Sequence, residues 1–175
     1  MARLPYADIS QSATQPLIDR IAAQRGGVLH LYRMLLHSPP IADGWLRYLT
    51  AIRHDCALPG GLRELIIMRV ARLNGAPYEA EQHAPIALKE GVTPAQLDAL
   101  DRWETSEQFD AVQRAVLGLT DVMTRDIHVP DEIFAAVAAE LGDPRLVVEA
   151  VATIAAYNMV SRFLEALQIS SQDLV

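Results

Sequence analysis

Two carboxylates and one imidazole in the middle of the chain have residue types and spacing that suit acid/base chemistry. Glu79 and His83 are four residues apart, so on a helix their side chains lie on one face, a turn from each other. A carboxylate there can hold the imidazole in one tautomer, as a general base near neutral pH requires. Glu64 lies on a preceding amphipathic segment, at the edge of its apolar stripe. We expect partial burial to raise the pKa of Glu64, which would let it serve as an acid.

The same residues also have a purely structural interpretation. A glutamate followed four residues later by a histidine is common on solvated helix surfaces. Glu64 could form a salt bridge with Arg69, with Arg72 or with an arginine of another chain. The spacing alone leaves both interpretations open.

Composition narrows the class of protein. A net charge of −7 over 175 residues disfavours a nucleic-acid partner, because phosphate binding needs a basic patch. No run of Lys or Arg suggests binding to an anionic membrane surface. Residues 1–14 contain no apolar run of signal-peptide length, and no stretch approaches the roughly 20 apolar residues that span a bilayer. We therefore expect a soluble cytoplasmic protein with no nucleic-acid and no membrane partner.

The single cysteine and the other histidines do not suggest a metal site. Cys56 excludes an intrachain disulfide and a Cys-rich metal centre. His30 and His37 are two helical turns apart, roughly 10 Å along the axis, which is too far to share one metal. His54 and Cys56 would point away from each other on a helix. We expect Cys56 to be an ordinary packing residue and expect no metal.

The elements that position these residues are all expected to be helices. Apolar side chains recur with helical spacing along nearly the whole chain, and no alternating strand pattern competes. The expected helices run from 17 to 25, 28 to 36, from 45 to a point before Pro59, 62 to 73, 77 to 91, from 94 onward, 109 to 123, 130 to 141 and 144 to 167. The sequence thus predicts an all-α fold: a polar, loosely packed N-terminal arm over residues 1–16 and a single helical domain over 17–175.

Two local signals refine this helical pattern. Thr93-Pro94-Ala95-Gln96 has the residues of a capping box, with proline at the first helical position. Pro85 stands inside the expected helix from 77 to 91 and should kink it near His83. Such a kink could shape a pocket, although a bent packing helix is the commoner meaning.

Several segments together resemble one protein family. They are Leu31–Leu35, His37-Ser38-Pro39, Leu62-Arg63-Glu64-Leu65, Tyr78-Glu79 with His83, Glu90-Gly91-Val92-Thr93 and Tyr157–Phe163. These segments, spread over residues 28–168, resemble the carboxymuconolactone decarboxylase and alkylhydroperoxidase D-like superfamily, in particular its decarboxylase-type branch. The resemblance implies an all-helical domain of the alkylhydroperoxidase D-like type that assembles into a homo-oligomer, a trimer or a hexamer.

The motif of the peroxidases in this family is only half present. Those members have a Glu, then a Cys-x-x-Cys pair, then a His four residues after the second cysteine. Aligned on His83, Glu64 takes the position of the Glu, Ala76 that of the first cysteine and Glu79 that of the second. Because a thiol peroxidase needs one thiolate to attack and another thiol to resolve, we expect no peroxidase activity by that mechanism.

The resemblance implies an enzyme that works by proton transfer without a cofactor. It suggests a lyase or isomerase that acts on a small carboxylate or lactone, with His83 as base or proton shuttle. In this interpretation Glu79 orients His83, and Glu64 is the second acid/base group. Tyr78 could donate a hydrogen bond to the substrate, although a buried tyrosine that anchors its helix is the commoner meaning.

Two basic side chains and two polar positions on the last helix complete the candidates. Arg63 or Arg69 could bind a substrate carboxylate, although salt bridging is the more frequent role for either. Asn158 and Arg162, four residues apart, match the family pattern and could either reach the pocket or join two subunits. The alternative to an enzyme is a non-catalytic helical oligomer that binds a small ligand or a partner, because fold alone is poor evidence of function.

Overall fold

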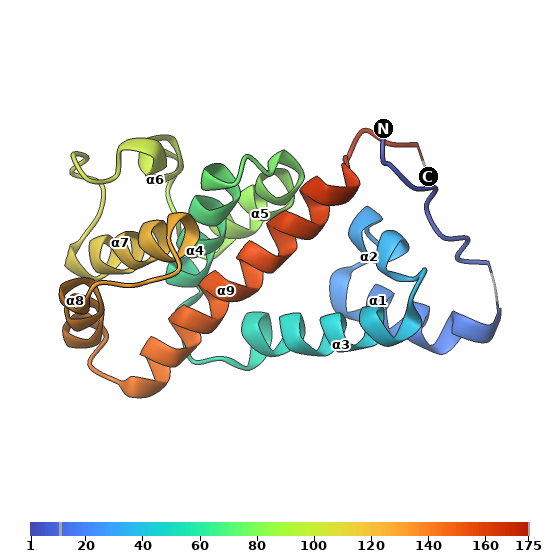
Figure 1. Cartoon of the computed structure of the whole chain (residues 1–175), viewed down its shortest axis with the longest axis horizontal. Helices are drawn as coiled ribbons and strands as arrows, with labels where there is room; N and C mark the ends of the chain where they lie inside the picture. The colour runs from blue at the N-terminus through green and yellow to red at the C-terminus, as the bar shows by residue number, and fades with distance from the viewer. Residues whose placement is uncertain (11, 175) are drawn as a thin grey trace. The chain divides into compact units, whose positions relative to one another are not determined.

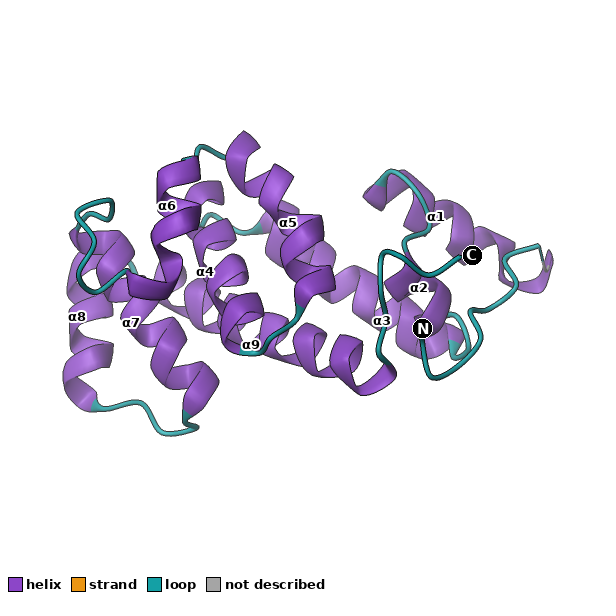
Figure 2. Cartoon of the chain, turned by 90° about the horizontal axis from the view of Figure 1, so that it is seen from above, coloured by secondary structure: helices purple, strands orange, loops and turns teal. Residues whose placement is uncertain are grey.

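The computed structural model describes residues 1–10 and 12–174, and all the regular elements of these residues are helical (Figures 1 and 2). This confirms the predicted all-α fold. The α-helices are α1 (Gln15–Arg25), α2 (His30–Leu35), α3 (Pro39–Thr50), α4 (Gly60–Leu73), α5 (Pro77–Lys89), α6 (Pro94–Ala99), α7 (Ala111–Arg125), α8 (Asp131–Leu141) and α9 (Pro144–Leu167). Shorter segments are η1 (Ser12–Thr14) and η3 (Leu100–Arg102), both 3-10 helical, and η2 (Ala51–Asp55), which is π-helical.

The chain divides into two compact units. Unit 1 comprises Met1–Asp55 and Leu164–Val175, and unit 2 comprises Cys56–Phe163. Helix α9 therefore begins in unit 2 and ends in unit 1. The expected boundary between an arm of residues 1–16 and a domain of residues 17–175 stays a prediction.

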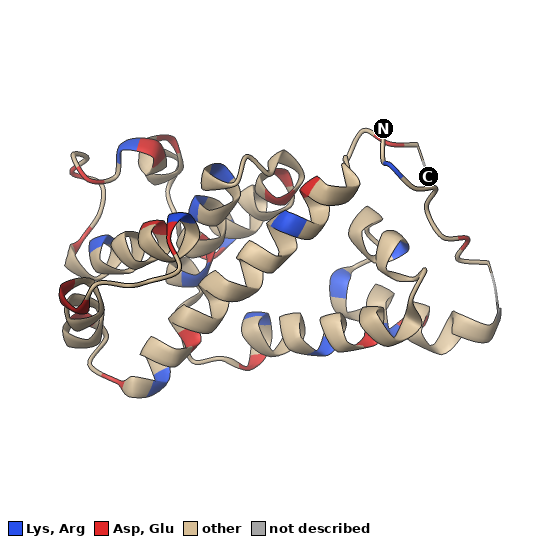
Figure 3. Cartoon of the chain, in the orientation of Figure 1, with Lys and Arg blue, Asp and Glu red and all other residues tan. Residues whose placement is uncertain are grey.

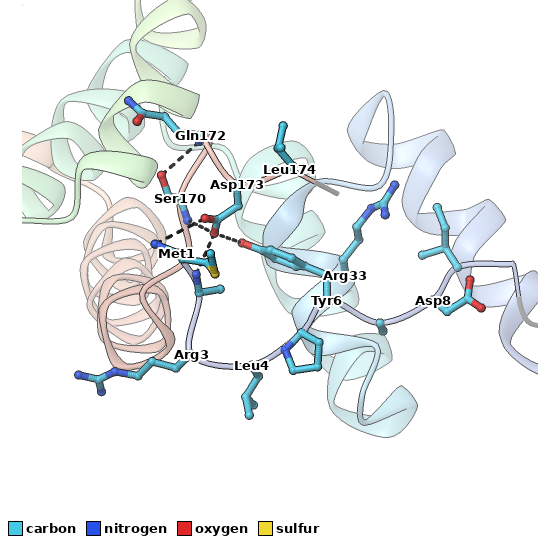
Figure 4. A pocket seen from close by; sticks show the side chains of 14 residues that line it. Met1, Arg3, Leu4, Tyr6, Asp8, Arg33, Ser170, Gln172, Asp173 and Leu174 are labelled. Carbon is cyan, nitrogen blue, oxygen red and sulfur yellow. Dashed lines mark hydrogen bonds and ion pairs between the residues drawn. The ribbon is translucent and has the colours of Figure 1, made fainter.

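The N-terminal arm is held by specific hydrogen bonds in unit 1. The backbone N–H of Arg3 donates to the carbonyl of Leu167 at 2.9 Å, and the Tyr6 hydroxyl donates to Oδ2 of Asp173 at 2.8 Å. The backbone N–H of Ala2 donates to the same carboxylate oxygen at 3.2 Å. Arg3, Tyr6 and Asp173, labelled in Figure 4, line a cavity of about 940 Å³ between the two ends of the chain. Residues 1–10 are exposed or half-buried, so these hydrogen bonds tie part of the arm to the C-terminal segment while the expectation of a loosely packed arm stays a prediction.

The two prolines after Ser38 have a different effect from the one expected. We expected Ser38-Pro39-Pro40 to end one helix and the next helix to begin near Trp45. Helix α2 does end at Leu35, but α3 begins at Pro39 itself. Proline suits the first turn of a helix because its fixed φ angle is helical and no N–H is needed there.

Helix α4 occupies the centre of unit 2. It packs against both α5 and α7, and its residues from Arg63 to Ala71 are all buried. An apolar cluster joins these helices to the α6 region, and its buried members are Leu65, Met68, Ala87, Val92, Ala99, Leu100, Phe109 and Leu117. Burial of such side chains contributes about 25 cal/mol for each Å² of apolar surface removed from water.

Capping boxes fix the beginnings of two helices in unit 2. At α6, the Thr93 hydroxyl accepts from the N–H of Gln96, and the Gln96 side chain accepts from the N–H of Thr93, as predicted. Asp110 and Gln113 form the same reciprocal pair at α7, which begins at Ala111, two residues after the expected start at Phe109. The Asp-x-x-Gln spacing was the available signal for this second box.

Helix α9 is long and apolar enough to cross a membrane by length and composition alone. Its charged residues lie near its two ends, as Figure 3 shows, and half of its most apolar stretch is buried inside the molecule. A core helix of a soluble protein meets the same criteria. The finding is therefore weak evidence for a membrane span.

A buried ion pair ties α4 to α7. Nε and Nη2 of Arg69 lie 2.6 and 2.7 Å from the two carboxylate oxygens of Asp121, a bidentate arrangement. Nη1 of Arg69 donates to the carbonyl of Leu100 at 3.0 Å. Both side chains are almost fully buried. Because the Arg69 nitrogens are occupied in this way, the structure favours its structural role over the substrate-binding role.

We predict that Asp121→Asn lowers the free energy of unfolding by about 3 kcal/mol, because it leaves the buried Arg69 charge without its partner. Urea unfolding followed by circular dichroism measures the change. Asp98→Asn, at an exposed position on α6, is the matched control and should cost less than about 0.5 kcal/mol. Equal effects of the two substitutions would contradict a stabilising role for the pair.

Candidate active site

Helices α4 and α5 bring Glu64 and His83 together. Oε2 of Glu64 lies 2.8 Å from Nδ1 of His83, within hydrogen-bond distance. Glu64 is fully buried, and His83 is 7% exposed. Both residues face the interface where α4 packs on α5, so helix packing positions the carboxylate on the ring. The arrangement is a buried carboxylate–imidazole dyad.

Arg63 and Glu90 extend the dyad into a chain of alternating charges. Nε of Arg63 donates to Oε1 of Glu64 at 3.2 Å, and Nη2 of Arg63 lies 3.4 Å from Oε1 of Glu90. Glu90 follows α5 and approaches the beginning of α4 at Gly60 and Gly61. A Cβ at Gly60 would lie 1.8 Å from Oε2 of Glu90, and one at Gly61 would lie 3.2 Å from the Glu90 carbonyl oxygen. The two glycines thus allow the close approach, and the beginning of a helix favours a negative charge.

The pKa of Glu64 is shifted in the opposite direction from the one expected. Burial by itself raises the pKa of a carboxyl group, as the sequence analysis assumed. The hydrogen bond and charge of His83, together with the Arg63 guanidinium, outweigh burial and hold the pKa of Glu64 below its usual value. The expectation of a raised pKa was therefore wrong. Glu64 is a carboxylate at neutral pH, suited to accept a hydrogen bond and not to donate a proton.

The Glu64 carboxylate determines which ring nitrogen of His83 can do chemistry. A carboxylate accepts a hydrogen bond, so it favours the tautomer in which Nδ1 of His83 carries the proton. In the neutral ring, Nε2 then has the lone pair that can accept a proton. If Nε2 accepts one, the nearby carboxylate stabilises the imidazolium that forms.

Glu79 has a different partner from the one that spacing suggested. It is buried on the first turn of α5, and its Oε2 accepts a 2.5 Å hydrogen bond from the Ser161 hydroxyl of α9. The carboxylate at Nδ1 of His83 is that of Glu64. Glu64 is thus in position for the orienting role, and the assignment of that role to Glu79 stays a prediction.

Helix α9 packs against the dyad through two residues on one face. The Tyr157 ring meets the His83 ring edge to face, with centroids 5.1 Å apart and an interplanar angle of 90°. Ser161, one turn later, donates to Glu79 and also to the Tyr157 carbonyl at 3.0 Å. Both residues lie in the segment Tyr157–Phe163, which resembles the family, and no catalytic or binding role was expected for either. No local signal could have paired Ser161 with Glu79, which lies 82 residues away in the chain.

The remaining candidates lie in different environments. Tyr78 is buried at the beginning of α5, next to Glu79. Arg63 is buried beside Glu64, whereas Arg69 is bonded to Asp121 on the α7 side of α4. Ala76, at the position of the first family cysteine, is buried directly before α5. Within residues 1–10 and 12–174, no group of three or more His, Cys, Asp or Glu side chains is placed to hold a metal ion.

Comparison with known proteins shows which family and which solved structures this chain is similar to. Residues 39–121, which include the dyad, match the sequence profile of the carboxymuconolactone decarboxylase family. The fold matches the alkylhydroperoxidase AhpD core of an uncharacterized peroxidase-related protein from Ralstonia eutropha, with a TM-score of 0.83 and 19% identity. That superposition covers 98% of this chain and 93% of the other. Residues 39–121 thus match the carboxymuconolactone decarboxylase family, and the chain has a fold like that of the AhpD core.

Another solved structure with this fold has a different named activity. The chain superposes on the debrominase Bmp8, a cysteine-to-alanine variant in complex with 2,3,4-tribromopyrrole, with a TM-score of 0.81 and 18% identity. That match covers 98% of this chain and 95% of Bmp8. The uncharacterized protein YdfG of Bacillus subtilis is 31% identical over 74 residues, which are 41% of this chain and only half the length of YdfG. The superfamily fold by itself thus leaves the reaction undetermined.

The lowered pKa of Glu64 predicts how Glu64→Gln changes stability with pH. A carboxyl whose pKa is lowered by folding stabilises the protein above its unfolded pKa, and this contribution is lost as pH falls through the folded pKa. Wild type should therefore exceed Glu64→Gln in unfolding free energy at about pH 7, and the difference should shrink toward about pH 3. Asp8, Asp43, Glu149 and Asp173 also have lowered pKa values, but they are present in both proteins. Urea unfolding at each pH measures the difference in unfolding free energy between the two proteins. A difference that stays constant with pH would contradict the lowered pKa of Glu64.

Proposed function

We propose that the protein is a lyase or isomerase that transfers protons on a small carboxylate or lactone without a cofactor. The observation that supports this proposal is the buried dyad, in which Glu64 lies 2.8 Å from Nδ1 of His83. A hydrogen-bonded carboxylate and imidazole are the base and orienting group that general base catalysis requires. The match of residues 39–121 to the carboxymuconolactone decarboxylase family supports the choice of reaction class.

In this proposal His83 moves the proton and Glu64 controls its tautomer. Nε2 of His83 takes a proton from a carbon next to a carbonyl, or returns one to it. In a decarboxylation, the bond to the carboxyl carbon breaks, its electron pair enters a dienolate, carbon dioxide leaves, and the His83 imidazolium protonates the dienolate carbon. Glu64 remains a carboxylate throughout, because its pKa is held low.

The buried groups around the dyad suggest how a substrate would be held. Arg63 uses Nε and Nη2 on Glu64 and Glu90, and its Nη1 has no hydrogen-bond partner among the described residues. We assign Arg63 to the substrate carboxylate and exclude Arg69, whose nitrogens already have partners. Glu79, fixed by Ser161, is the second acid/base candidate, and Tyr78 beside it is the candidate hydrogen-bond donor.

Exchange of carbon-bound protons with solvent tests the proposal directly. A panel of small unsaturated lactones and carboxylates is incubated with the protein in D₂O and followed by proton NMR for deuterium uptake, isomerisation or decarboxylation. Against a substrate that reacts, His83→Gln should slow the reaction by about 10²–10⁴-fold, because it removes the base. Glu64→Gln should slow it less, because the base remains but its tautomer is no longer fixed by a charge.

The controls separate lost chemistry from lost folding. Glu107→Gln removes an exposed carboxylate in the loop before α7 and should react at the wild-type rate. Far-ultraviolet circular dichroism and size-exclusion chromatography of each variant should match those of wild type. Full activity in His83→Gln would reject the proposal in favour of a non-catalytic helical protein that binds a small ligand or partner.

We further propose that the protein is a homo-oligomer, a trimer or a hexamer. The support is the likeness to the AhpD-type fold together with the large exposed apolar side chains of Ile41 and Tyr48 on α3, each more than 40% exposed. Contiguous exposed apolar surface is a feature of protein interfaces. Light scattering coupled to size-exclusion chromatography should give a mass three or six times the 19.2 kDa of the chain.

A further inference from the structure

Unit 2 contains an apolar cavity whose lining includes neither residue of the dyad. Its volume is about 570 Å³, and it is formed by α7, the α7–α8 connection, α8 and α9. Seven of its nine lining residues are apolar, including Met123, Phe134 and Ala155. The other two are Asn158 and Arg162. A volume of roughly 300–1,000 Å³ with mostly apolar walls and few polar groups is typical of small-molecule sites.

Arg162 provides a positive charge at this cavity with no ion-pair partner. Among the described residues, no carboxylate oxygen lies within 4.0 Å of its guanidinium nitrogens. Its one hydrogen bond in the structure is a long one of 3.5 Å, from Nη1 to Oδ1 of Asn158. A guanidinium binds a carboxylate through two parallel N–H donors, and the other donors of Arg162 are available for this purpose.

Asn158 belongs to the framework of the cavity. It is buried, and its Nδ2 donates to the Thr124 hydroxyl and to the Ile154 carbonyl, both at 3.0 Å. Its Oδ1 accepts from Nδ2 of Asn74 at 3.1 Å. Because Asn158 is held by partners on α7, on α9 and at the end of α4, Arg162 is the polar group that a ligand would contact.

We infer that this cavity is a binding site for a small apolar monocarboxylate, with its hydrocarbon part among the α7, α8 and α9 side chains and its carboxylate on Arg162. A single guanidinium among apolar walls favours one negative charge attached to an apolar body. The ligand would cover Ile127 and Phe134, which are 92% and 48% exposed. Removing this apolar surface from water is favourable.

The site is distinct from the one proposed for proton transfer. On α9, Tyr157 and Ser161 contact the dyad and its neighbour Glu79, whereas Asn158 and Arg162 line the cavity. Successive helical residues differ by roughly 100° in direction, so the two pairs define adjacent faces of one helix. Neither Glu64 nor His83 lines the cavity. The inference therefore does not depend on the proposed catalytic function.

Calorimetric titration with octanoate, and with 1-octanol as its neutral counterpart, tests the charge recognition. Octanoate should bind saturably with one molecule per chain, and 1-octanol should bind at least about tenfold more weakly, because it cannot pair with the guanidinium. Arg162→Gln should weaken octanoate binding by a similar factor and leave binding of 1-octanol unchanged. Arg102→Gln, at an exposed arginine of unit 2 that does not line the cavity, should bind octanoate like wild type.

A substitution that fills the cavity tests whether octanoate binds there. Ala155 is exposed and lines the cavity, so Ala155→Phe should abolish octanoate binding without disturbing the core. Ala135→Phe, on an exposed position of α8 outside the lining, is the matched control and should bind normally. His83→Gln should also bind normally, so loss of catalysis and loss of this site are distinguishable.

Three results would overturn the inference. Equal binding of octanoate and 1-octanol, or unchanged octanoate binding by Arg162→Gln, would show that Arg162 does not select the carboxylate. Absence of saturable binding to wild type would exclude the site. If Ala155→Phe instead lowers the mass measured by light scattering while wild type fails to bind octanoate, the face is covered by a second copy of the chain.

Discussion

The burial of three charged side chains on α4 is the constraint around which unit 2 is organised. Arg63, Glu64 and Arg69 all lie in a helix that is covered by α5 and α7. A buried charge is tolerated only with an opposite partner and satisfied hydrogen bonds, because its desolvation otherwise costs several kcal/mol. Each neighbouring element therefore supplies one: His83 from α5, Glu90 from the turn after it and Asp121 from α7. The partners that compensate the buried charges of α4 thus also hold α5 and α7 against it, and one of them forms the dyad with Glu64.

The two ends of α4 serve different purposes as a result. Near its beginning, Arg63 and Glu64 are paired in a chain that includes a titratable imidazole, which suits proton transfer. Near its end, Arg69 is held in a fixed geometry by two carboxylate oxygens and a carbonyl. The proposed chemistry therefore belongs to the first end, and the second anchors the helix that supports it.

The positions of the family cysteines show how one scaffold can support different chemistry. Ala76 and Glu79 stand where the peroxidases of the superfamily have their thiols, and Glu79 is bonded to Ser161 of α9. A carboxylate can accept and release protons but cannot form a disulfide. Glu64 and His83 without the thiol pair suit the proton transfer that we propose.

Much of the fold could be predicted from local sequence because its determinants are local. Helical periodicity identified the helices, and Thr93 and Gln96 identified a capping box whose two partners are three residues apart. The error at Pro39 was also local, since two prolines can end one helix and begin the next. The hydrogen bonds of the N-terminal arm were not predictable in this way, because their acceptor Asp173 lies far away in the chain.

For the site, the sequence by itself determined which residue types were available, and that Glu79 and His83 lie one turn apart on one helix face. Only the tertiary structure decided which carboxylate reaches Nδ1 of His83, because Glu64 lies 19 residues away and helix packing sets that distance. The direction of the Glu64 pKa shift was likewise a tertiary result. The sequence indicated that the Glu64 carboxyl would be buried. The direction of its pKa shift, however, depends on whether the hydrogen bond and charges of its partners outweigh the cost of desolvation. That balance is set by distances between side chains of different helices, which no spacing along one segment contains.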